Sequence, residues 1–111
     1  MKIEEVKSGH TLVMTPEGRL DAQSAQPFQE RILRRIEDGE KSILLDFSKI
    51  DYISSSGLRA LLIAAKHLRE SSGRLAICLL TDKVREVFQV SGFDTVVEIY
   101  PDKETALQRL S

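Results

Sequence analysis

The fold is decided by residues 42–58, which read SILLDFSKIDYISSSGL. This stretch opens with Ser42 to Phe47, a nearly continuous apolar run without alternation, which is typical of a central strand covered on both faces. It closes with three serines and a glycine, directly before an apolar stripe of helical spacing that begins at Leu58. The next apolar run, Arg74 to Leu80, indicates another strand. Strand, helix, strand is a βαβ unit, so we expect these two strands to be parallel.

Apolar residues at helical spacing predict about four helices along the chain. These residues are Phe28, Ile32, Leu33 and Ile36; Leu58, Leu61, Leu62, Ala65 and Leu68; Val84, Val87 and Phe88; and Ala106, Leu107 and Leu110. The first helix should start at Ala25 and end near Gly39, and the third should end at Gly92. Thr81 or Asp82 is suited to cap the third helix, and Asp102 the last one.

Three further strands are expected outside the βαβ unit. Ile3 to Val6 and Thr11 to Thr15 are short β-type stretches around a turn at Ser8-Gly9, and Pro16 should end the second of them. The last strand should cover Thr95 to Tyr100. A chain of 111 residues leaves too little room for two cores. We therefore expect an α/β fold, one domain over residues 1–111, with a mixed sheet of about five strands whose later members are parallel.

Composition argues against several classes of function. Sixteen basic residues stand against seventeen acidic ones, and the aromatic residues are only two Tyr and four Phe. No global field or stacking surface therefore favours nucleic acid or an anionic membrane. No apolar run approaches the roughly 20 residues that span a bilayer, and no signal-peptide core is present, so a cytoplasmic location is expected. Cys78, the only cysteine, lies in an apolar strand and is expected to be a buried thiol.

The serine cluster has a simple structural interpretation. Any of Ser54, Ser55 or Ser56 could cap the following helix by accepting a hydrogen bond from a free N–H group. One cap needs only one serine, however, and Gly57 inside the first turn costs up to about 1 kcal/mol relative to Ala. Something besides helix stability should therefore shape this turn.

Chemical interpretations of the same cluster are possible. A hydrolase elbow would need glycine at Ile53, and neither His10 nor His67 is expected near the serines, so a catalytic nucleophile is disfavoured. A nucleotide P-loop is not supported because the Gly-Lys-Ser/Thr ending is absent. Free N–H groups and the positive end of the helix dipole would nevertheless suit an anion or a covalent phosphate.

The order of residues 43–58 resembles the core signature of STAS domains, the sulphate-transporter and anti-sigma-factor-antagonist family. Matching segments follow in the right order at Glu17–Asp21, Val87–Phe93 and Ile99–Tyr100. The resemblance therefore covers essentially the whole chain.

This resemblance implies a regulatory protein similar to bacterial anti-sigma factor antagonists, without enzymatic activity, cofactor or metal. Such proteins bind a serine kinase that also acts as an anti-sigma factor, and this binding releases the sigma factor. The kinase phosphorylates a serine at the start of the second helix, which dissociates the pair, and a PP2C-type phosphatase resets it. The alternative is a small-molecule or nucleotide- or anion-binding module of a larger assembly.

The family's usual DSSGL aligns on Ser54–Leu58, which places the phosphate acceptor at Ser55, with Ser54 and Ser56 as alternative acceptors. Ser54 stands where the family usually has an acidic residue. Asp21 could contact the partner, as the resemblance implies, or cap the first helix. The expected partner-binding residues are Asp21, Ser54, Ser55, Ser56, Gly57, Leu58 and Arg59.

Two sets of charged residues remain. Asp46 and Asp51 could suggest a metal site or a phospho-aspartate site, but two carboxylates without a third ligand favour solvated loop residues. Arg59, Lys66 and Arg69 lie on the polar side of the second helix and could meet an acidic partner or the phosphate, although a solvated face is the favoured interpretation for Lys66 and Arg69.

Overall fold

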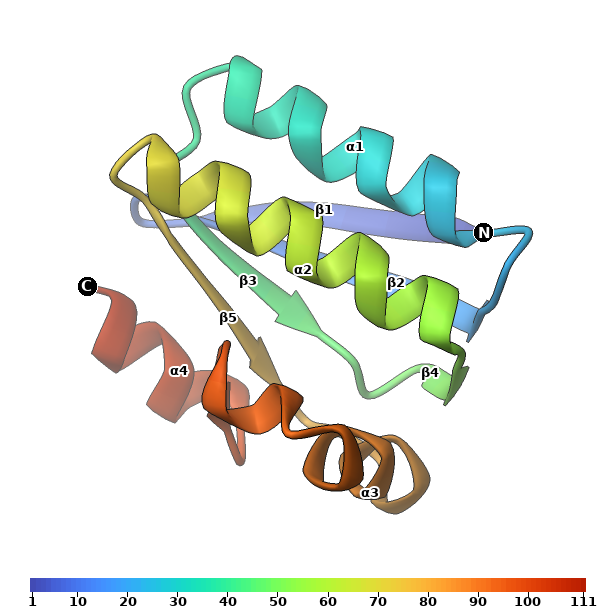
Figure 1. Cartoon of the computed structure of the whole chain (residues 1–111). Coiled ribbons are helices and arrows are strands. Elements are labelled where there is room, and N and C mark those ends of the chain that lie inside the picture. Colours follow the sequence, from blue (N-terminus) through green and yellow to red (C-terminus); the bar gives the residue numbers. More distant parts are fainter.

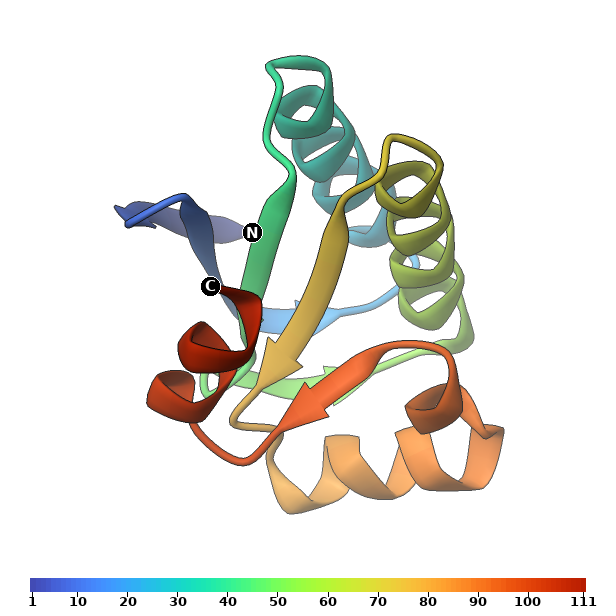
Figure 2. The same ribbon diagram turned by 90° about the vertical axis from the view of Figure 1, so that its left-hand side faces the viewer.

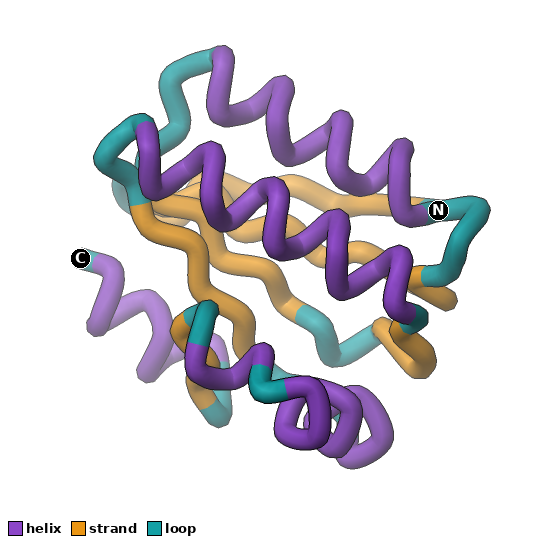
Figure 3. Tube along the Cα trace, in the orientation of Figure 1, coloured by secondary structure: helices purple, strands orange, loops and turns teal.

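The computed structural model describes all of residues 1–111 as a sheet with helices on both faces (Figure 1). The elements in chain order are β1 (Lys2–Ser8), β2 (Thr11–Leu20), α1 (Ala25–Glu37), β3 (Ser42–Asp46), β4 (Ile50–Ile53), α2 (Ser55–Glu70), β5 (Arg74–Cys78), α3 (Asp82–Ser91), the short 3-10 helix η1 (Phe93–Thr95), β6 (Glu98–Tyr100) and α4 (Lys103–Leu110). Figure 2 shows α1 and α2 side by side on one face and α4 on the other. Helix α3 lies across one end of the sheet, and Figure 3 shows how short the connecting loops are.

The sheet is mixed, and its later strands are parallel, as the sequence predicts. The strand order is β1-β2-β3-β5-β6, with β4 paired to β2 off this path. Strands β1 and β2 form an antiparallel hairpin, whereas β2–β3, β3–β5 and β5–β6 are parallel. The parallel β3–β5 pairing confirms the βαβ unit, whose crossover is α2.

Strand β4 was not predicted, and the expected end of β2 at Pro16 is wrong. Strand β2 continues to Leu20, because its first part pairs with β3 and its last part, Gly18–Leu20, pairs with β4. Pro16 lies between these two parallel pairings, opposite Ile3 of the hairpin. Strand β2 therefore tolerates a residue without an N–H group at a place where neither parallel neighbour pairs with it.

The main core lies between the sheet and the helices α1, α2 and α3, the last of which contributes Val84 and Phe88. A smaller cluster under α4 includes Val13, Leu44 and Cys78. Leu62, which the helical pattern assigned to the core, is 45% exposed. The buried side of α2 instead includes the small residues Ala60 and Ala64, which the sequence pattern did not weigh because small side chains carry a weak hydrophobic signal.

The last strand is shorter than predicted. The chain forms η1 after Gly92, whose φ of 74° ends α3, and only Glu98–Tyr100 pair with β5. The ring of Phe93 packs edge-on against Phe88, with 5.2 Å between centroids. Burial of this aromatic pair favours the turn over an earlier start of the strand.

Helix α4 is tied to the sheet by a charged pair that the sequence did not indicate. Asp46 is buried, not a solvated loop residue, and its carboxylate lies 3.2 Å from Lys103 Nζ. It also accepts a hydrogen bond from the Ser48 amide. Burial acts to raise the pKa of Asp46, but the hydrogen bonds from Ser48 and the ammonium of Lys103 outweigh it, so the pKa lies below its ordinary value. Asp51, by contrast, is exposed.

Replacing Asp46 by Asn should lower the free energy of unfolding by about 1 to 2 kcal/mol at pH 7, because Ser48 and Lys103 then face a neutral acceptor in place of a charged one. The folded-state pKa is depressed, so this contribution is complete above the unfolded pKa and disappears as pH falls through the folded one. Urea unfolding should therefore separate the two proteins at pH 7, and the difference should disappear as the pH falls through the depressed folded-state pKa of Asp46. Asp51→Asn, at an exposed position, should change little; an equal loss in both variants would contradict this account.

Candidate functional site

Ser54 caps helix α2 and joins it to the end of β2. Its Oγ accepts a hydrogen bond from the Gly57 amide at 3.2 Å and donates one to the Leu20 carbonyl at 3.3 Å. Its own amide donates to the same Leu20 carbonyl at 3.0 Å. The sequence could not decide which of the three serines caps the helix. The structure shows that it is Ser54.

At Gly57, α2 lies directly against the ends of β2 and β4. A Cβ atom at this position would lie 2.7 Å from the Leu20 carbonyl oxygen and 2.8 Å from Ile53 Cγ1. Such distances are too short for any side chain larger than hydrogen. The glycine that costs helix stability is therefore required by the close approach of α2 to β2 and β4.

Ser55 and Ser56 differ in exposure. Ser55 is exposed, and its hydroxyl takes part in none of the protein's side-chain hydrogen bonds. Ser56 is half-buried in a groove between α1 and α2 that is also lined by Ala22, Gln29 and Arg59. Of the three serines, Ser55 has the most accessible hydroxyl.

Asp21 lies in the turn between β2 and α1, beside the serine cluster. Its Oδ1 accepts hydrogen bonds from the amides of Gln23 at 3.0 Å and Ser24 at 3.1 Å. The hydrogen bond from the Ser24 amide is the main reason that the pKa of Asp21 is lowered. The N-cap position of α1 is Ser24, so Asp21 braces the turn before the helix and does not itself occupy the cap. Leu20, bound by Ser54, precedes it directly, which places this turn next to the start of α2.

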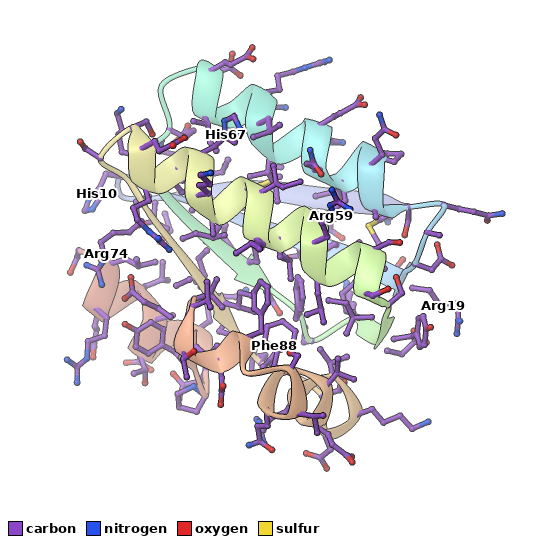
Figure 4. The ribbon with its side chains drawn as sticks, in the orientation of Figure 1. His10, Arg19, Arg59, His67, Arg74 and Phe88 are labelled. Carbon is purple, nitrogen blue, oxygen red and sulfur yellow. The ribbon has the colours of Figure 1, made fainter.

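Arg19 and Tyr52 belong to the same surface but were not predicted. The guanidinium carbon of Arg19, which Figure 4 labels, lies 4.1 Å from the centroid of the Tyr52 ring, and its Nε lies 3.8 Å from Asp21 Oδ2. The two residues are cross-strand partners in the β2–β4 pairing. Tyr52 is nevertheless 40% exposed. The sequence does place an aromatic residue, Tyr52, in the segment Ile50–Ile53. Its contact with Arg19 can be predicted only if that segment is known to be a strand beside β2.

The two remaining predicted site residues point in different directions. Leu58 is partly buried and packs against the main core, so most of its side chain supports the helix. Arg59 is exposed on α2, toward α1. Of the predicted partner-binding residues, Ser55 and Arg59 are therefore exposed beside the turn of Asp21, whereas Leu58 packs inward and Gly57 is buried.

Neither histidine lies near the start of α2, where the serines are (Figure 4). His67 is twelve positions beyond Ser55 on α2, which corresponds to about 18 Å along a helix. His10 instead lies beside the end of α4, where its Nε2 is 3.1 Å from the Leu110 carbonyl oxygen. Burial raises the pKa of the Cys78 thiol to about 12, so this cysteine stays protonated.

No cluster of three or more His, Cys, Asp or Glu side chains could hold a metal ion. No helix has the length and apolarity of a membrane span.

Comparison with known proteins adds a family to this geometry. The sequence model of the STAS domain matches residues 2–106. A Bordetella bronchiseptica protein that carries the name anti-sigma factor antagonist BtrV is 35% identical over 106 residues, which cover 96% of this chain and 91% of that protein. These matches confirm the resemblance found in the sequence.

Solved structures show the same fold. A Thermotoga maritima protein described as an anti-sigma factor antagonist superposes with a TM-score of 0.93 at 21% identity, covering 97% of this chain and 93% of its own. The Bacillus cell fate determinant SpoIIAA, in its phosphorylated form, superposes with a TM-score of 0.74 at 23% identity, covering 99% of this chain and 100% of its own.

The division between capping and exposed serines can be measured. Ser54→Ala should lower the free energy of unfolding by about 1 kcal/mol, because the Gly57 amide loses its partner. Ser55→Ala should change it by less than about 0.5 kcal/mol, as for most exposed positions. Urea denaturation of both variants tests this assignment, and a larger loss for Ser55→Ala would reverse it.

Gly57→Ala should destabilise the protein by about 1 to 3 kcal/mol, because the added methyl group meets backbone and core atoms. This loss exceeds the gain of up to about 1 kcal/mol that Ala offers in a helix. Ser56→Ala is the matched control, since it also places Ala in the first turn but adds no atom. If thermal unfolding showed Gly57→Ala to be as stable as the control, the close approach would not be the reason for this glycine.

Proposed function

The chain belongs to the STAS domain family, and we propose that it is a phosphorylation-switched regulator of the anti-sigma factor antagonist type. In its unphosphorylated form it binds a serine kinase that is also an anti-sigma factor, through the surface around Ser55. Phosphorylation of Ser55 by that kinase releases the pair, and a PP2C-type phosphatase restores binding. The observation that carries this proposal is the exposed Ser55 hydroxyl, free of hydrogen bonds, at the start of a helix capped by its neighbour.

A phosphate at Ser55 is compatible with the fold. The cap belongs to Ser54, so modification of Ser55 leaves the Gly57 hydrogen bond in place. The first turn of α2 contains no acidic residue that would repel the phosphate. The positive end of the helix dipole also stabilises an added anion at this position. The modification should therefore change the surface without unfolding the helix.

The effect on a bound partner would be large. A phosphate adds about −1.5 to −2 charges at neutral pH. Placed at a closed interface, such a charge is desolvated and repelled by any acidic group opposite it. Asp21, Arg19 and Tyr52 surround the start of α2 and would form the rest of the contact.

Names and structures of relatives support the same assignment. BtrV carries the name of an anti-sigma factor antagonist and matches nearly the whole chain. SpoIIAA, which shares the fold, has been solved in a phosphorylated form. Ser54 replaces the acidic residue that usually precedes the acceptor in the family. This chain thus begins from a less acidic local surface, so the phosphate should make a larger difference.

Partner capture with purified protein tests this function. The unmodified chain should capture a serine kinase. Ser55→Asp should bind that kinase at least tenfold more weakly, because its negative charge imitates the phosphate. Mass spectrometry identifies the captured protein, and incubation with that kinase and ATP should phosphorylate the unmodified chain but not Ser55→Ala.

Two controls make the capture experiment specific. Ser55→Ala should still bind the kinase, because it adds no charge. Ser8→Asp makes the same charge change on the exposed strand β1 and should also still bind. If Ser55→Asp bound the kinase as tightly as the unmodified chain, the switch would be wrong. If the chain bound a nucleotide tightly and no kinase, the alternative of a small-molecule module would replace it.

A further inference from the structure

One exposed face of α2 continues from Ser55 along the helix. Ser55, Arg59, Leu62 and Lys66 follow one another at intervals of four, three and four residues, which places them on the same side. All four are exposed, and Arg69 extends the row toward the end of the helix. We call these five residues the α2 strip.

The positive charges of the α2 strip are not compensated within the protein. None of the ten ion pairs of the chain involves Arg59, Lys66 or Arg69. Other arginines are engaged; Arg35, for example, binds Glu5. Glu30 of α1 lines the same groove as Arg59 without pairing with it, and the only acidic residue of α2 is Glu70, its last. The chain as a whole has a net charge of −1, so this positive face is local.

We propose that the α2 strip is a docking surface for an acidic patch on the kinase partner, with Leu62 meeting an apolar spot inside that patch. The proposal rests on the function proposed above and specifies the chemistry of the partner. The charge of the strip supports it, since the unpaired cations Arg59 and Lys66 flank Leu62, which is 45% exposed, and Arg69 adds a third cation further along the helix. An exposed apolar residue framed by like charges suits an interface that is steered by charge and closed by a small dry contact.

The same geometry indicates how a phosphate would act. Ser55 and Arg59 are one helical turn apart, where side chains of opposite charge attract one another. A phosphate on Ser55 would bind the guanidinium of Arg59 and withdraw it from the partner. The phosphate therefore competes for the cation that the partner's carboxylates need, besides repelling the partner.

Binding of the purified kinase, the one captured in the experiment above, tests the α2 strip. Arg59→Gln should weaken binding about three- to tenfold, mainly through slower association, and should reduce the dependence of affinity on salt. Arg34→Gln is the matched control, because Arg34 is exposed on α1, forms no ion pair and loses the same charge. Leu62→Ala should also weaken binding, whereas Val90→Ala, at an 83% exposed valine of α3, should not.

The outcomes separate this inference from the proposed function. Equal affinities of Arg59→Gln and Arg34→Gln for the kinase would show that the α2 strip is not its docking surface. The proposed phosphorylation switch would still hold if Ser55→Asp failed to bind. Failure of the unmodified chain to bind any serine kinase would overturn both.

A measurement without the partner tests the pairing of Arg59 with the phosphate. With phosphoserine incorporated at position 55, phosphorus NMR titration should give a second phosphate pKa about 0.3 unit lower in the unmodified background than in Arg59→Gln. The Arg34→Gln background should behave like the unmodified one. An identical phosphate pKa in all three would overturn the competition for Arg59.

Discussion

The structure around Ser55 depends on the close contact between the first turn of α2 and the end of β2. Gly57 permits this contact because any side chain there would overlap the Leu20 carbonyl and Ile53. The same carbonyl accepts hydrogen bonds from the amide and the hydroxyl of Ser54. One backbone oxygen of β2 therefore fixes where α2 begins, and with it which serine is turned inward and which outward.

This arrangement gives adjacent serines different environments, one structural and one exposed. Ser54 uses its hydroxyl for the helix and the sheet, whereas the Ser55 hydroxyl forms no bond inside the protein. A modification of Ser55 can thus change the surface while the cap persists. Asp21 is held by the amides of its own turn, which follows Leu20 directly, so the second part of the surface is positioned by the same strand end.

The sequence predicted the parallel core, the helices and the serine cluster because these follow from hydrophobic periodicity and from local capping chemistry. It did not predict β4, because Ile50–Ile53 has buried residues only at its two ends and lacks the alternation of a strand. Pro16 also contributed to this omission, because it suggested that β2 ends before the residues that pair with β4. The pair of Arg19 and Tyr52 was missed as a consequence, since their contact exists only through the β2–β4 register. Leu62 was placed in the core because periodicity weighs leucine above alanine, whereas the face of α2 toward the core needs small residues.

The position of Ser54 also bears on the electrostatics of α2. An acidic residue in its place could cap the helix equally well. It would, however, put a permanent negative charge beside the start of the helix, within the range over which surface charges interact at physiological salt. Serine provides the cap without that charge, so Arg59 and the helix dipole remain uncompensated until an anion arrives. A neutral cap beside the α2 strip therefore leaves its cations available to both anions of the proposed switch, the partner's carboxylates and a phosphate on Ser55.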